Sequence, residues 1–209
     1  MGNARTVALV VLGALVLAAG AAGAATTIVL PKPGQVGLAA GGGFGGVTEA
    51  GPIGGVFGSG PTFCVRGRYR MRYERALGVS FESQWLEARV PAPPYDPLYP
   101  DRVAYTRLSL ITSGLELYQM FGTRTRTTRM LMVGAGIAQL RSRFNSGETG
   151  VGDAQSGDGA YVSAGAGVER FFYRSWAFDL SGRYLSVFRD GKANHDLQAA
   201  LGLIFYASY

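Results

Sequence analysis

Arginine occupies every second position of one short segment, and this spacing restricts what the chain can form. Between Phe63 and Tyr73, positions 66, 68, 70 and 72 are arginine, and the positions between them are Gly, Tyr and Met. Side chains of a β-strand alternate between its two faces, so the segment predicts a strand with one basic face and one apolar face. A helix would spread both sets around its circumference. The rest of the chain must decide whether the arginines point into solvent or into a polar interior.

Seven further segments alternate in a similar way, and together they predict eight strands. The expected ranges are 34–44, 63–73, 77–87, 104–121, 128–144, 160–172, 176–189 and 197–209. In the fourth, Leu110 falls on one face but Leu115 and Leu117 fall on the other, so we expect a bulge between them. The connections 45–62, 88–103 and 145–159 are long, 74–76, 122–127 and 173–175 are short, and 190–194 is intermediate. Short turns at one end and long loops at the other are typical of transmembrane barrels.

Residues 34–209 resemble the eight-stranded outer-membrane barrels of the OmpA transmembrane domain and OmpX/Ail type. The last strand ends in Phe205, Ala207 and Tyr209, which is similar to the aromatic-ended final strand of that family. The resemblance implies an all-β, up-and-down antiparallel transmembrane barrel in the cell outer membrane. It also implies contact with outer-membrane lipid and with the export and barrel-assembly machinery. The OmpA-type C-terminal peptidoglycan-binding domain is expected to be absent.

The first 25 residues have the pattern of a secretory signal peptide. Arg5 supplies a positive charge, residues 7–19 are apolar, and small residues continue to Ala25. We therefore expect a cleaved signal peptide over 1–25 and one barrel domain over 26–209; an uncleaved membrane anchor is the alternative. Cys64 is the only cysteine, so no internal disulfide can form, and it is expected to fill interior space.

Two kinds of barrel compete, because a soluble lipocalin-like barrel would turn the arginines outward and a membrane barrel would turn them inward. Aromatic residues collect at both strand ends, as two interfacial girdles require: Phe44, Phe63, Trp85 and Phe188 at one end, and Tyr73, Phe172, Trp176 and Tyr209 at the other. The polar faces also carry carboxylates, and buried charges must be paired. The membrane barrel is therefore predicted, with an interior charge network of Arg66, Arg68, Arg70, Arg72, Glu82, Glu116, Glu169, Asp179 and Arg183.

A specific ion pair follows from the turn expected at 74–76. If Tyr73 lies opposite Leu77, paired residue numbers on these two strands sum to 150. Arg68 then faces Glu82, and Arg66 or Arg70 shares the same carboxylate.

The sequence holds few candidates for catalysis or cofactor binding. His195, the only histidine, is expected near Ser186 on the lipid face, and no acid or oxyanion donor can be assigned beside them. We expect no catalytic residue, metal or cofactor. The net charge of +6 suits nucleic acid only as a clustered, solvent-facing patch, so no nucleic-acid partner is expected.

The second long connection is the best candidate for contact with another surface. Its five prolines stiffen it, and Tyr95 and Tyr99 lose little entropy on binding; it could equally pack over the barrel mouth. The leading function is a non-enzymatic outer-membrane barrel with a plugged interior and a structural or surface-interaction role. Passage of small molecules through a narrow OmpW-like barrel is the alternative, and modification of lipid A is the third possibility.

Overall fold

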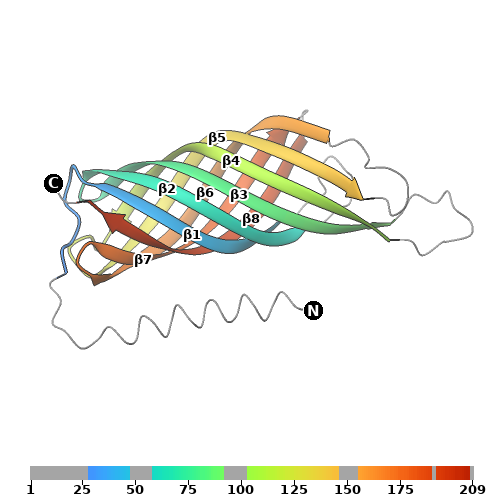
Figure 1. Ribbon diagram of the computed structural model, residues 1–209. Coiled ribbons are helices and arrows are strands. Elements are labelled where there is room, and N and C mark those ends of the chain that lie inside the picture. The colour runs from blue at the N-terminus through green and yellow to red at the C-terminus, as the bar shows by residue number, and fades with distance from the viewer. Residues whose placement is uncertain (1–27, 48–57, 92–102, 146–154, 190–191, 208–209) are drawn as a thin grey trace, which may run out of the picture.

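Eight antiparallel strands close into a single barrel in the computed structural model, which describes residues 28–47, 58–91, 103–145, 155–189 and 192–207. Each strand pairs with the next along the chain, and β1 pairs with β8 to close the sheet. Figure 1 shows the strands tilted around one axis, with the short turns at the left. The strands are β1 Val36–Val47, β2 Ser59–Arg72, β3 Arg75–Pro91, β4 Val103–Phe121, β5 Thr127–Asn145, β6 Gln155–Tyr173, β7 Trp176–Arg189 and β8 Lys192–Tyr206.

The predicted strand number and order are confirmed, but the prediction of a bulge in β4 is wrong. Its register against β3 and β5 is continuous across positions 110–115. Leu110 points into the barrel and is 4% exposed, whereas Leu115 and Leu117 point outward. The mixed pattern of β4 therefore reflects an interior that is partly apolar.

The turn between β2 and β3 is shorter than predicted. β2 ends at Arg72 and β3 begins at Arg75, with a register irregularity between Arg70 and Arg72. Tyr69, not Tyr73, pairs with Leu77, and residue numbers in the regular part of the pairing sum to 146 rather than 150. The last connection is also shorter than predicted, since β8 already begins at Lys192.

The outer surface of the barrel is apolar around its circumference. Val79 (57% exposed), Leu180 (56%) and Leu203 (41%) all point outward, while the arginines on β2 before Arg72 point inward. The aromatic side chains predicted for the two girdles are exposed on this surface, apart from Tyr209, which lies outside the described residues. A closed sheet with an apolar exterior and a charged interior suits a bilayer, so the predicted transmembrane barrel is confirmed and the soluble lipocalin-like barrel is not.

Among the described residues, no helix has the length and apolarity needed to cross a membrane.

The interior is arranged in layers along the barrel axis, and β7 shows the order within one strand. From the short-turn end its inward residues are Ala177, Asp179, Ser181, Arg183 and Leu185, all buried. An apolar layer is thus followed by a charged layer and then by a second apolar layer. Two buried clusters lie toward the short turns, comprising Ala39, Phe171, Ala177, Ile204 and Tyr206 in one and Ala76, Tyr118, Met120, Met130 and Met132 in the other. A third lies toward the long connections, comprising Leu110, Ala138, Tyr161, Leu185 and Val187.

Candidate functional site

The charged layer inside the barrel has two linked parts, of which the first is centred on Glu82. Arg66 donates from Nη2 to Glu82 Oε1 at 2.7 Å, and Arg183 contacts the same oxygen from the opposite wall. Arg183 also lies 2.7 Å from Glu116. These side chains come from β2, β3, β4 and β7, so the first part ties together strands that do not all adjoin in the sheet.

The second part is centred on Glu169 and lies closer to the short turns. Arg68 contacts Glu169 and also donates to Asp179 at 3.1 Å, while Arg70 donates to Glu169 Oε2 at 3.0 Å. The Tyr206 hydroxyl donates to Glu169 Oε1 at 2.8 Å. Since all of these side chains are buried, each charge depends on its partners rather than on water.

Two tyrosine rings support the arginines and occupy space left by glycines. The Arg68 guanidinium lies 4.2 Å from the centre of the Tyr118 ring, which favours the cation electrostatically. Tyr118 covers Gly78, and Tyr206 covers Gly37, where a Cβ would come within 2.7 Å of the ring. Neither tyrosine is among the predicted network members, although their even numbers place them on the inward faces of β4 and β8.

The predicted Arg68–Glu82 ion pair is wrong, because the shorter turn displaces β3 along β2. Glu82 lies opposite Cys64 instead, so Arg66 is the arginine of β2 that reaches it. Arg68 is paired with carboxylates of β6 and β7, across the barrel. Cys64 itself is buried on the inward face, as expected of an interior filler.

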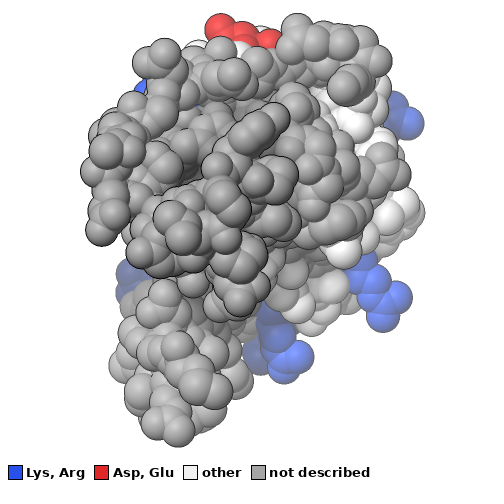
Figure 2. Space-filling model, turned by 90° about the vertical axis from the view of Figure 1, so that its right-hand side faces the viewer, with Lys and Arg blue, Asp and Glu red and all other residues white. Residues whose placement is uncertain are grey.

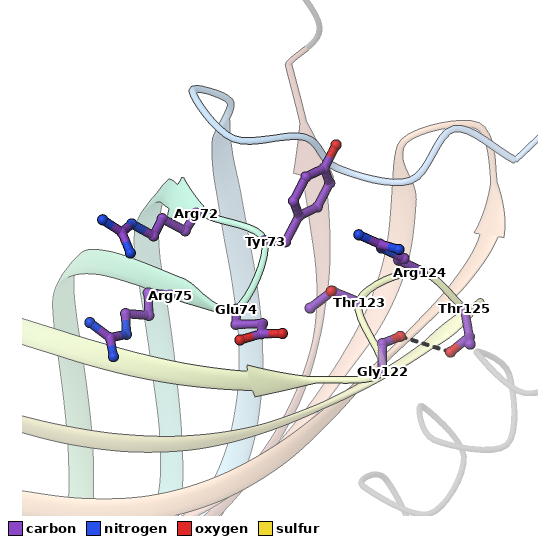
Figure 3. Close-up of a pocket in the computed structure, with 8 residues that line it drawn as sticks. All are labelled: Arg72, Tyr73, Glu74, Arg75, Gly122, Thr123, Arg124 and Thr125. Carbon is purple, nitrogen blue, oxygen red and sulfur yellow. Dashed lines mark hydrogen bonds between the residues drawn. The ribbon is translucent and has the colours of Figure 1, made fainter.

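The prediction that Arg72 belongs to the interior network is also wrong. It is exposed, because β2 ends there and the register shifts just before it. Arg72 lines a hollow of about 490 Å³ between two turns, together with residues of the 72–75 and 122–125 segments. In Figure 3 its guanidinium and that of Arg75 lie on the same side, away from Arg124. Thr125 Oγ1 donates to the Gly122 carbonyl at 2.8 Å and holds the second turn.

The other predicted network members lie where the inward faces of their strands converge. They are Arg66, Arg68, Arg70, Glu82, Glu116, Glu169, Asp179 and Arg183, four cations and four carboxylates, each at most 4% exposed. A further buried carboxylate, Asp196, lies outside this set and accepts hydrogen bonds from Gln198 at 2.9 Å and Gln84 at 3.4 Å. Alternation along β8 already placed Asp196 on the polar face, so its burial could have been predicted.

Ser186 and His195 are direct cross-strand partners on β7 and β8. Ser186 Oγ lies 3.0 Å from His195 Nδ1, and the imidazole stacks on Tyr184 at 5.5 Å between ring centres. The pair is half-buried on the lipid-facing side near the long connections. A serine beside an imidazole is one element of a nucleophilic site.

The end of the barrel with the long connections is seen face-on in Figure 2, where Lys and Arg side chains protrude at the circumference. Tyr95 and Tyr99, predicted to contact other surfaces, lie outside the described residues. Within the described ranges, no group of three or more His, Cys, Asp or Glu side chains is placed to hold a metal ion.

Comparison with known proteins supports the fold. Neither a scan of protein-family models nor a search of curated proteins gave a match. Among solved structures, the Yersinia pestis attachment invasion locus protein Ail, in complex with the heparin analogue sucrose octasulfate, is 14% identical with a TM-score of 0.54; the match covers 84% of this chain and 99% of Ail. Neisserial surface protein A is 13% identical with a TM-score of 0.55, over 81% of this chain and 96% of that protein. This chain therefore has the fold of the eight-stranded outer-membrane β-barrels of the OmpA and OmpX/Ail type.

Proposed function

We propose that the chain is a non-enzymatic outer-membrane barrel with a plugged interior and a structural or surface-interaction role. The observation that carries this proposal is the layered interior. Charged side chains fill the middle of the barrel, and buried apolar side chains lie on both sides of them. An eight-stranded barrel is just wide enough for side chains to fill its interior. The barrel then acts as an anchor, delivered by the export and barrel-assembly machinery, and the long connections make contacts.

Passage of small molecules is the alternative that this interior opposes. Passage needs a continuous polar path, and the apolar clusters around Met120 and Leu185 interrupt one. Purified protein in a planar lipid bilayer should give no single-channel steps, while a general porin in the same bilayer gives them. Reproducible conductance steps that are lost when the barrel is unfolded would contradict the plugged interior and show that the barrel is a channel.

Contact with another surface is assigned to the second long connection. Its tyrosines and prolines favour binding with a small loss of entropy, and the Ail structure was solved with a heparin analogue bound. Cells that display the parent barrel should bind to some glycans of a glycan array. Cells that display Tyr95→Ser/Tyr99→Ser should not bind to these glycans. A matched control is Tyr69→Ser, which changes an outward tyrosine at the opposite end. Parent cells that bind no more than barrel-free cells would contradict contact with glycans.

Hydrolysis of a lipid ester is a second candidate function, favoured by the Ser186–His195 hydrogen bond on the lipid-facing side. Under the non-enzymatic proposal, expression leaves the mass spectrum of lipid A unchanged. An enzyme would remove an acyl chain from lipid A. It would be established if the parent and Ser113→Ala, which changes an outward serine of β4, both remove the chain and Ser186→Ala does not.

A further inference from the structure

The short-turn end of the barrel carries an excess of positive charge. Its exposed cations are Lys32, Arg72, Arg75, Arg124, Arg126, Arg129, Arg170 and Arg174. Glu74, seen between the two turns in Figure 3, is the only carboxylate exposed at this end among the described residues. These cations are not neutralised by the interior carboxylates, which are occupied by the buried arginines. The surface therefore favours an anionic ligand.

Two of these arginines point sideways toward lipid. Arg129 of β5 and Arg170 of β6 stand on outward faces, and they are diagonal neighbours because Thr127 pairs with Arg170 and Arg129 pairs with Val168. Arg170 also pairs with Phe178, whose ring stacks on Phe172 with 4.5 Å between centres. Aromatic rings at a strand end mark the level of the lipid head groups. Both guanidinium groups can therefore reach phosphate at the membrane surface.

An apolar groove of about 540 Å³ begins at Arg129 and crosses the outer face of β5, β6 and β7. Ala166 and Gly182, which pair across β6 and β7, form its floor. Its sides are larger outward residues, namely Phe121, Leu131, Val168 and Leu180. The groove lies within the apolar belt and is continuous with the surface that lipid covers.

We propose that this groove binds one anionic phospholipid of the leaflet at the short-turn end. An acyl chain lies over Ala166 and Gly182, and the phosphate is bound by Arg129 and Arg170. Arginine suits this role because its planar fork binds phosphate oxygens through two parallel hydrogen bonds. A head group with a net negative charge is preferred over a zwitterionic one, since one exposed carboxylate opposes eight exposed cations in the part of this end that the structure describes.

The head-group part is tested by the fluorescence of Trp176, an outward residue on β7 at the same end. Trp85→Phe leaves Trp176 as the one tryptophan, and this protein is inserted into phosphatidylcholine vesicles. Phosphatidylglycerol with brominated acyl chains is then added, because bromine quenches tryptophan fluorescence on contact. The preference for phosphatidylglycerol should fall about 30-fold in Arg129→Gln/Arg170→Gln. Each arginine near a membrane surface contributes about 1 kcal/mol to the binding of anionic lipid, so two together account for a change of this size. Arg141→Gln, an outward arginine of β5 at the other end, should leave the preference unchanged. An equal loss in both variants, or no preference in the parent, would overturn the proposal.

The acyl-chain part is tested by filling the groove. A Cβ at Gly182 meets its nearest atom at 3.9 Å, so the backbone tolerates a side chain there. Gly182→Leu should release phosphatidylglycerol that the parent retains in native mass spectra from detergent, whereas Ala160→Leu, an outward small residue elsewhere on β6, should retain it. Both proteins must first show the heat-modifiable gel shift of a folded barrel. Full retention by Gly182→Leu would overturn the groove as the binding site.

Discussion

Removing Glu82 should destabilise the barrel mainly by isolating Arg66. The Glu82 carboxylate is buried and contacts both Arg66 and Arg183. After Glu82→Ala, Arg183 retains its ion pair with Glu116 at 2.7 Å, whereas Arg66 retains a hydrogen bond to the Ser181 hydroxyl at 2.9 Å and only the longer-range attraction of Glu116. Leaving a buried charge without its counter-ion costs about 3–5 kcal/mol. We expect a loss in that range, and a smaller loss for Glu116→Ala, whose arginine keeps Glu82.

A double-mutant cycle tests which arginine depends on Glu82. Urea unfolding in lipid vesicles, followed by tryptophan fluorescence, gives the free energy of unfolding for the parent, the single variants and the double variants. Arg66→Ala and Glu82→Ala should be non-additive by about 0.5–3 kcal/mol, because they remove the same contact. Arg68→Ala and Glu82→Ala should be coupled more weakly than that, since their ion-pair partners differ and they are linked only through Tyr118, Glu116 and Arg183. Additivity in the first cycle with coupling in the second would refute the observed register.

Three further outcomes are expected. Leu203→Arg should cost about 2–4 kcal/mol in the same vesicle assay, because it places a charge in the hydrocarbon layer; assembly equal to the parent would contradict the outward orientation. Gly37→Ala should cost about 1–3 kcal/mol by displacing the Tyr206 ring, whereas Gly42→Ala, with its nearest contact at 3.6 Å, should change unfolding by less than about 1 kcal/mol. N-terminal sequencing of the membrane-inserted protein should begin after Ala25; recovery of the initiator methionine would rule out cleavage.

Alternation determined the faces of the strands correctly but could not determine their register. The residue sum is 147 at the turn, where Arg72 pairs with Arg75, and the register irregularity next to it brings the sum to 146. Since 146 and the predicted 150 are both even, Arg66, Arg68 and Glu82 still point inward. Only the identity of the partner changes. The length of a hairpin turn depends on backbone geometry over a few residues, and neither Tyr73 nor Glu74 is a strong turn signal. Face assignments are therefore more secure than pairings in a chain of this kind.

The cross-barrel contacts could not be predicted, because they depend on closure of the sheet. Arg68 and Glu169 are separated by 101 residues and stand on β2 and β6, which are not adjacent. Strand polarity shows that both point inward, but barrel radius and stagger decide which charges meet. The error at Leu110 has a related origin. The bulge is expected only if Leu110, Leu115 and Leu117 must share one apolar face, whereas the closed interior contains apolar layers as well as charged ones.

The two groups of arginines are under opposite physical constraints, and this separates their functions experimentally. Arg66 is 3% exposed and depends on a carboxylate, so its replacement by alanine should lower the free energy of unfolding by several kcal/mol. The same replacement should leave the preference for anionic lipid unchanged, because Arg66 lies inside the barrel. Arg129 is exposed at the membrane surface, and substitutions at such positions usually change stability by no more than about 0.5 kcal/mol. Arg129→Gln should therefore alter the preference for anionic lipid while unfolding at the parental urea concentration. If it destabilises the barrel as strongly as Arg66→Ala, the exposed arginines serve the fold and not a ligand.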